Sequence, residues 1–309
     1  MLRLGLCCGF VDEPIRFRTA TARYVAGLPL AAARAYLLEV ARHNAFSLEQ
    51  AVQWCAQHDV GAFRIPSKLI PLATHPEHHQ LLRVLDDDTT FQASVQRVRR
   101  LAPRIRLSFH PDPFVVPGSA SNGTSESSLR ELEHHARMAH WVGAEQITIH
   151  GGGAQPDKKQ ALLRLVRALD RLSRAARERV VLENDDRVFT VEDLLPACHQ
   201  HGIPLVYDVH HHRCNPDGLS EEEATVQAAA TWGGREPWAH VSSPEAGWSE
   251  ADPRPHADFI QPRDFPVHWL TTRLTVDVEA KARERAVLRL QRWIRRHDAA
   301  ATVPAAPLH

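Results

Sequence analysis

The sequence predicts an α/β protein with a single (β/α)8 barrel, the TIM-barrel fold, over residues 1–298. Short apolar runs alternate with long amphipathic stretches, which is the signature of repeated βα units. Eight such runs within 309 residues match the arithmetic of one barrel. No internal repeat or linker divides the chain. Its last segment, Ala299–His309, is predicted to be a disordered tail.

Each predicted strand is a short apolar or β-branched run, and residues such as Gly61, Gly143 and Gly202 lie near the boundaries. The first run carries one charge and is too short for a signal peptide, so we interpret it as a strand. The strands are expected at Leu2–Cys8, Ala62–Ile65, Ile105–His110, Gln146–His150, Val180–Glu183, Ile203–Asp208, Ala239–Ser242 and Leu274–Glu279.

The stretches between the strands have helical periodicity. In Leu30–His58, apolar residues such as Leu38, Ala41 and Ala45 recur at spacings of three or four. The seventh crossover, Pro244–Thr272, is Pro-rich and irregular. The other helices are expected at Thr89–Leu101, Ser125–Val142, Asp157–Arg177, Val191–His201, Ser220–Thr231 and Glu284–Arg296.

The composition excludes several classes of protein. A hydrophobic fraction of 43% with 24% charged residues is that of a globular chain, and no run of about 18 apolar residues predicts a membrane span. The five cysteines form no CxxC pair, which argues against a disulfide framework and a thiolate zinc module. We expect buried, inert thiols in a cytoplasmic monomer.

The formal net charge is zero, with 37 basic and 37 acidic residues. Nucleic-acid-binding proteins more often have a basic excess, so this balance weighs mildly against a DNA substrate. However, divalent metals bound to a carboxylate cluster would neutralise it and leave the remaining surface more positive.

Histidine is unusually frequent, with 20 residues, and imidazole is the commonest metal-ligating side chain. Histidines on predicted helices, including His134, His135 and His140, are expected to be surface or packing residues. Others end predicted strands together with carboxylates. These strand-end residues are His110, His150, Glu183, Asp208 with His211, His240, and Glu279 with Lys281.

In a TIM barrel the carboxyl ends of the strands surround one active site, so these side chains are expected to converge. Glu183 and Glu279 end apolar strands, where an unpaired carboxylate is costly to bury. Because no lysine or arginine ends a neighbouring predicted strand, we expect metal ions to supply the positive charge. Nitrogen and oxygen donors suit Zn, Mn, Fe or Co, and a multinuclear site suits phosphodiester hydrolysis.

With these residues the chain resembles the UV damage endonuclease family, relatives of endonuclease IV among the xylose-isomerase-like barrels. The resemblance covers nearly the whole length. Its carriers are Arg16–Thr19, Ala62–Ile65, Leu107–Asp112, Phe114–Val116, His150–Gly152, Leu182–Asp185, Asp208–His212 and Val278–Lys281.

The resemblance implies a DNA repair endonuclease that cuts the backbone immediately 5′ to a UV photoproduct in double-stranded DNA. It implies three divalent ions, with manganese favoured and zinc or magnesium as alternatives. Glu183, Glu279, His75 and Lys281 would belong to the catalytic site, where His75 could contact the scissile phosphate. The implied metal ligands are His110, His150, Glu183, Asp208, His211, His240, His256 and Glu279.

The chain departs from the family at three places. Pro113 and Phe114 stand where lesion-probing members have Gln followed by Tyr or Phe, and Phe114 could still stack on a distorted base step. Trp238 stands where many members have Lys. The segment Cys7–Phe10 also differs. The residues expected to contact DNA are Pro113, Phe114 and Phe10. These changes concern the lesion-reading surface and leave the hydrolytic core intact.

Two other classes of function remain. A small-molecule metalloenzyme on the same barrel, such as a sugar isomerase or epimerase, is favoured slightly by the neutral charge and Pro113 but disfavoured by the His-rich ligand pattern. A metal-binding protein without turnover is disfavoured because it would have no use for carboxylates at strand ends.

Overall fold

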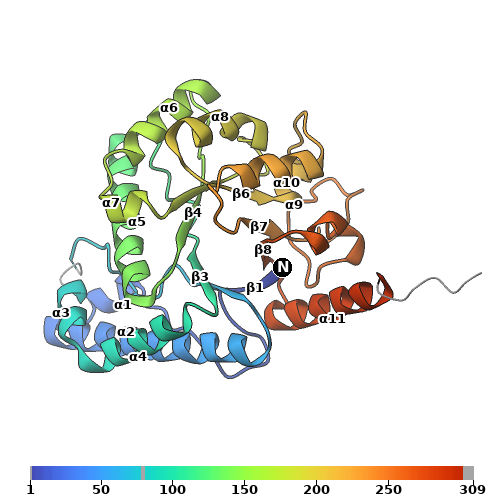
Figure 1. Ribbon diagram of the computed structural model, residues 1–309. Coiled ribbons are helices and arrows are strands. Elements are labelled where there is room, and N and C mark those ends of the chain that lie inside the picture. The colour runs from blue at the N-terminus through green and yellow to red at the C-terminus, as the bar shows by residue number, and fades with distance from the viewer. Residues whose placement is uncertain (1, 78–80, 302–309) are drawn as a thin grey trace, which may run out of the picture.

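The computed structural model describes residues 2–77 and 81–301. Over these residues eight parallel strands form one closed barrel in the order β1 to β8, so the predicted (β/α)8 fold is confirmed (Figure 1). The strands are β1 Arg3–Cys7, β2 Ala62–Ile65, β3 Arg106–Phe109, β4 Gln146–His150, β5 Val180–Glu183, β6 Leu205–Asp208, β7 Trp238–Val241 and β8 Thr275–Val278.

Helices cover the outside of this barrel, as Figure 1 shows for α2, α4, α5 and α8. The helices are α1 Ala22–Ala26, α2 Leu30–Gln57, α3 Leu81–Asp87, α4 Thr89–Leu101, α5 Asn122–Val142, α6 Lys158–Leu169, α7 Arg174–Arg177, α8 Val191–His201, α9 Val209–Cys214, α10 Glu221–Ala230 and α11 Arg283–Ala301.

Three details differ from the sequence prediction. The helix expected at Asp157–Arg177 is two helices, because Ser173 caps a new one at α7. α9 was not predicted. α11 extends to Ala301, into the segment predicted as a tail, and residues 302–309 of that segment lie outside the described residues.

The seventh crossover is irregular, as predicted. Among its described residues it contains two short 3-10 helices, η1 Pro262–Asp264 and η2 Val267–Thr271, where the other crossovers have α-helices. An isolated antiparallel bridge between Pro244 and His256 orders its first part. This bridge lies close to the carboxyl ends of the strands, because Ala257 bonds to Ser243 and Lys281 through its backbone.

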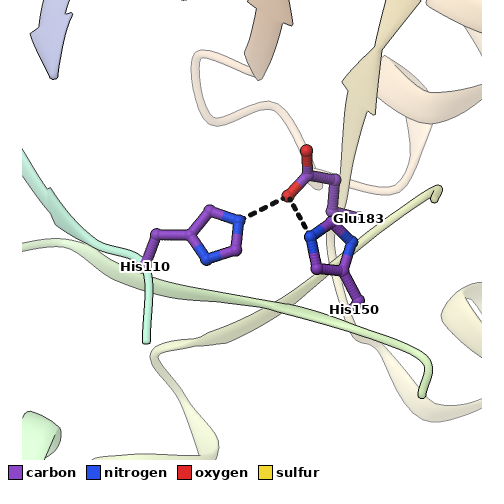
Figure 2. Close-up of side chains that lie close together, drawn as sticks. All are labelled: His110, His150 and Glu183. Atoms are coloured by element: carbon purple, nitrogen blue, oxygen red, sulfur yellow. Dashed lines mark hydrogen bonds and ion pairs between the residues drawn. The ribbon is translucent and has the colours of Figure 1, made fainter. Parts of the chain in front are cut away.

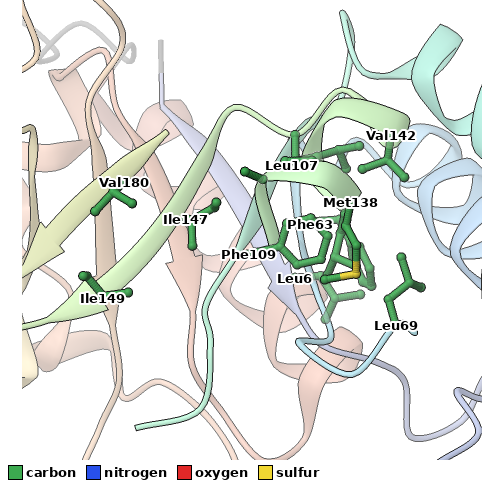
Figure 3. Packing of buried hydrophobic residues seen from close by; sticks show 14 of the residues in the cluster. Leu6, Phe63, Leu69, Leu107, Phe109, Met138, Val142, Ile147, Ile149 and Val180 are labelled. Carbon is green, nitrogen blue, oxygen red and sulfur yellow. The ribbon is translucent and has the colours of Figure 1, made fainter. Parts of the chain in front are cut away.

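The main core lies between the strands and the helices. Successive side chains of a strand point to opposite faces, so residues such as Leu107 and Phe109 face outward and pack with Met138 and Val142 of α5 (Figure 3). The alternate residues of the same strand, Arg106 and Ser108, face the barrel interior. Arg106, for example, donates to Thr275 of β8. The strands thus place polar side chains such as Arg64 and Arg106 inside the barrel, beside a small separate apolar cluster of Ala62, Val181, Val206, Trp232 and Trp238.

No helix among the described residues is both long enough and apolar enough to cross a membrane. We expected all five thiols to be buried, but only some of them are. Cys55 and Cys198 are buried, whereas Cys7 and Cys214 are partly exposed and Cys8 is exposed.

Candidate metal centre

Glu183 lies at the centre of the candidate site. It ends β5 and is fully buried. His110 Nε2 donates to Glu183 Oε2 at 2.8 Å, and His150 Nε2 lies 3.8 Å from the same oxygen, so both rings face one carboxylate (Figure 2). His240 Nδ1 donates to the other oxygen, Oε1, at 2.7 Å. The ends of β3 and β4 and strand β7 thus each direct one imidazole at Glu183.

Asp208 and His211 form the next part of the site. Asp208 ends β6 and caps α9, because its Oδ1 accepts from the backbone N–H of His211 at 2.7 Å. The resulting turn brings His211 Nδ1 to 3.5 Å from Glu183 Oε1. Asn184 holds the Asp208 backbone from the next strand, donating to its carbonyl at 2.8 Å and accepting from its N–H at 2.9 Å.

Glu279 and His256 complete the group. Glu279 follows β8, with Oε1 at 3.3 Å from His240 Nδ1 and Oε2 at 3.6 Å from His256 Nδ1. His256 comes from the bridge in the seventh crossover. Each of the eight predicted ligands therefore lies within 4 Å of another one, in a single group at the carboxyl end of the barrel.

We expected no arginine or lysine to pair with the carboxylates at the strand ends, and this was wrong for Glu279. Arg64 of β2 supplies a buried positive charge, with Nη1 at 2.5 Å from Glu279 Oε1 and Nε at 3.0 Å from Asp277 Oδ2. β2 is far from β8 in the sequence, but in the closed barrel only β1 separates the two strands. Glu279 thus has a cationic partner of its own, and the surroundings of Glu183 are imidazoles.

In the ion-free protein the buried carboxylates and imidazoles of the group shift one another's pKa. Burial alone would raise the pKa of Glu183, but the surrounding imidazoles, His240 foremost, lower it well below its usual range. Burial alone would lower the pKa of His211, but the carboxylates of Asp208 and Glu183 raise it to about 9. The ion-free protein therefore holds protonated imidazole and guanidinium against buried carboxylates.

The donor set fits divalent ions. Two sets of ligand atoms each lie within 4.8 Å of one another: the His110 group, which comprises His110, His150 and Glu183, and the Glu279 group, which comprises Glu183, Asp208, His240 and Glu279. Asp208 Oδ2 is buried and has no hydrogen-bond partner among the described residues. A buried carboxylate oxygen in this state is costly, and a bound cation would satisfy it.

Two residues assigned to the catalytic site contact other partners. Lys281 is half-exposed, and its Nζ lies 2.6 Å from Glu245 Oε1. His75 lies in the loop after β2, where its Nδ1 accepts from the backbone N–H of Glu77 at 3.4 Å. Neither of these contacts involves the eight grouped side chains.

Of the three predicted DNA contacts, one is buried and two are exposed. Phe10 is 3% exposed and packs edge-on against Trp54, with ring centroids 5.1 Å apart, so its assignment as a DNA contact was wrong. The aromatic ring belongs to the core, where it also stacks on Phe63 with ring centroids 6.2 Å apart. Pro113 and Phe114 are exposed in the loop after β3, and Phe114 is 82% exposed.

Sequence reasoning missed Arg64, Asp277 and Asn184. The first two carried a usable signal, because each is a charged residue within an otherwise apolar predicted strand. The outer face of each strand packs against apolar helix residues. A charged residue in a strand of this barrel is therefore expected to point into the barrel interior. Trp238 also faces inward, where the guanidinium carbon of Arg106 lies 4.2 Å from its ring centroid.

The profile of the UV-endonuclease UvdE family matches residues 2–306. The chain belongs to this family. Similar members include the UV DNA damage endonuclease of Bacillus velezensis, which is 32% identical over 82% of this chain and 81% of its own. The corresponding enzyme of Deinococcus radiodurans is 32% identical over 94% of each chain.

Solved structures agree with this family assignment. SacUVDE superposes with a TM-score of 0.86 at 26% identity, covering 96% of this chain and 99% of its own. Endonuclease IV from Thermus thermophilus, at 17% identity and a TM-score of 0.60, covers 96% of this chain and 99% of its own. D-psicose 3-epimerase from Clostridium cellulolyticum, at 10% identity and a TM-score of 0.56, covers 96% of this chain and 98% of its own. At such identities the likeness of the last two concerns the fold alone.

Proposed function

We propose that this protein is a metal-dependent DNA repair endonuclease that hydrolyses the phosphodiester bond 5′ to UV photoproducts. The observation that carries the proposal is the convergence of eight side chains with nitrogen or oxygen ligand atoms into one group, with buried Glu183 at its centre. Membership of the UV-endonuclease family supports the substrate. Divalent ions bound there would stabilise negative charge on the attacking and leaving oxygens of a phosphoryl displacement.

The eight side chains would divide the binding of the ions among them. Glu183 belongs to both the His110 group and the Glu279 group, so it is suited to bridge two ions. His211 and His256 would bind a third ion, nearest the loops. The donor set admits manganese, which we favour, as well as zinc, and the carboxylates admit magnesium.

The residues around this group would bind DNA. Phe114 is exposed beside the strand that leads to His110, where an apolar ring could insert at a distorted base step. Pro113 precedes it and offers no side-chain hydrogen bond to a base. His75 lies in a neighbouring loop and would contact the scissile phosphate, and Lys281 would add a positive charge near Glu279.

A sugar isomerase or epimerase on the same barrel is the second candidate. It shares the fold, and the net charge of zero suits it. However, the His-rich set of eight ligands disfavours it, and the relatives that match most of this chain are named as UV DNA damage endonucleases. We therefore place it behind the nuclease.

Incision of end-labelled duplexes tests the proposal. The duplexes carry one cyclobutane dimer, one 6-4 product, one abasic site or no lesion, and the buffer contains Mn²⁺. We expect a cut immediately 5′ to the photoproduct and a 3′-hydroxyl end. If the ion-loaded protein cuts none of the duplexes, the proposed activity is wrong.

Glu183→Gln is the matching variant. It removes the charge shared by both groups and should lower incision by more than about 100-fold, since even an outer partner of a metal ligand is worth about 10- to 100-fold. Uptake of Mn²⁺ should fall as well. Glu49→Gln is the control, because Glu49 is a buried carboxylate on α2 that pairs with Arg97. Equal activity in the two variants would contradict the assignment of Glu183.

A further inference from the structure

Arg64 lies within the candidate site but cannot bind a metal, because a guanidinium has donors and no acceptor. Its side chain is 8% exposed and points into the barrel. Three of its nitrogens bond to three different residues. Nε donates to Asp277 Oδ2 at 3.0 Å, Nη1 to Glu279 Oε1 at 2.5 Å and Nη2 to His240 Nε2 at 2.7 Å.

These bonds orient two of the proposed ligands. In the ion-free protein His240 Nε2 accepts from Arg64, so the ring proton is on Nδ1, which points at the carboxylates of Glu183 and Glu279 at 2.7 and 3.3 Å. Glu279 has one oxygen fixed by Arg64, and its other oxygen is directed to His256. The guanidinium therefore sets both the ring orientation of His240 and the rotation of the Glu279 carboxylate.

Arg64 is itself held from β8 and β1. The Asp277 side chain is 1% exposed and accepts from Arg64 Nε. Asp277 fits in this position because residue 5 of β1 is glycine. A Cβ at Gly5 would lie 2.2 Å from Asp277 Oδ1. Gly5, Asp277 and Arg64 thus form a fixed support behind the Glu279 group.

We propose that Arg64 is a positioning residue that organises the Glu279 group for ion binding and has no such effect on the His110 group. The inference rests on the metal ligands of the proposed function. It follows from the selectivity of the contacts, because Arg64 bonds to His240 and Glu279, whereas His110 and His150 face Glu183 from β3 and β4. A hydrogen-bond donor to a ligating carboxylate, as Arg64 is to Glu279, is worth about 10- to 100-fold in metal affinity.

Titration of the metal-free protein with MnCl2, with free Mn²⁺ followed by its EPR signal, tests this role. Arg64→Met should weaken one class of sites by about 10- to 100-fold and leave another unchanged. Arg64→Lys retains the charge with a single nitrogen and should recover part of the lost affinity. His110→Asn should weaken the class that Arg64→Met retains.

Arg106→Met is the matched control. Arg106 is also an arginine inside the barrel, but it bonds to Glu145, Glu236 and Thr275, away from the candidate site. Its loss should lower the melting temperature and leave Mn²⁺ uptake as in the wild type. A change in uptake equal to that of Arg64→Met would mean that Arg64 acts only through stability, and would overturn the inference.

The remaining outcomes are decisive as well. Uniform weakening of every class of site, or unchanged uptake, in a folded Arg64→Met protein overturns the positioning role and leaves the proposed function standing. A wild-type protein that takes up no ions overturns the proposed ligands together with this inference. If Arg64→Met does not fold, Arg64→Lys and Asp277→Asn carry the test, and wild-type uptake in both overturns it.

Discussion

At the scale of the residue, Asp208 combines two roles through its two oxygens. Oδ1 caps α9 by accepting from the His211 N–H, and Oδ2 is buried and free of hydrogen bonds among the described residues. Side-chain caps usually stabilise a helix start by about 0.5–2 kcal/mol. Here the cap also fixes the position of His211, so local stability and site geometry depend on the same carboxylate.

Phe114 is the residue whose exposure calls for a partner, since 82% of its surface is open to solvent. Phe114→Ala should reduce incision of photoproduct duplexes about 5- to 150-fold, because stacking on a base is worth about 1–3 kcal/mol by alanine substitution. Phe46→Ala, which removes an aromatic ring 50% exposed on α2, is the control. If the two variants reduce incision of photoproduct duplexes equally, Phe114 is not part of the recognition surface.

At the scale of the element, α5 carries two histidines into the core. His134 is 5% exposed and His135 is fully buried, in agreement with the expectation of surface or packing residues. Neither ring nitrogen of His134 has a hydrogen-bond partner among the described residues. Burial lowers the pKa of His134 from 6.5 to about 3. The helix therefore packs with this ring neutral.

This burial makes the stability of the protein depend on pH. The unfolded chain binds a proton at His134 below about pH 6.5 and the folded chain does not, so stability falls as the pH falls through that range. At pH 5 the loss should be about 2 kcal/mol relative to pH 7. His134→Leu should remove that part of the slope in urea unfolding at the two pH values. His140→Gln, at an exposed site on α5, should leave the slope unchanged, and the same slope in both variants would contradict the assignment.

At the scale of the whole molecule, the two ends of the barrel have different tasks. The carboxyl end holds the eight donors. At the other end Glu236 accepts from Arg3 of β1, Arg106 of β3 and Thr275 of β8, and so joins strands that are distant in the sequence. In barrels of this fold, chemistry is concentrated at the carboxyl end and stability at the opposite one.

Glu236→Gln tests this division. The change weakens hydrogen bonds to charged groups, which are worth about 1.5–3 kcal/mol, so the free energy of unfolding should fall by about that amount in urea titrations. Mn²⁺ uptake and incision should stay at the wild-type level, in contrast to Glu183→Gln. A loss of ion binding with unchanged stability would show that the two ends are not independent.

Sequence patterns were sufficient for the fold class and for the convergence of the donors. His110, His150, Glu183 and Asp208 each follow or end a predicted strand, and parallel strands of one barrel necessarily bring their carboxyl ends together. The irregular seventh crossover was also visible, as a Pro-rich stretch. His256 in that crossover was assigned only through the family resemblance, since no local periodicity marks it.

The tertiary structure alone decided which side chains meet across the barrel. The pairing of Arg64 with Glu279 depends on closure of the barrel through β1, and the burial of Phe10 depends on its packing against Trp54 of α2. Periodicity reports which face of its own element a residue occupies. It carries no information on which distant element lies opposite, because that depends on strand order, register and closure. The sequence by itself therefore determined the barrel and the end at which its donors gather, and only the folded chain determined their partners.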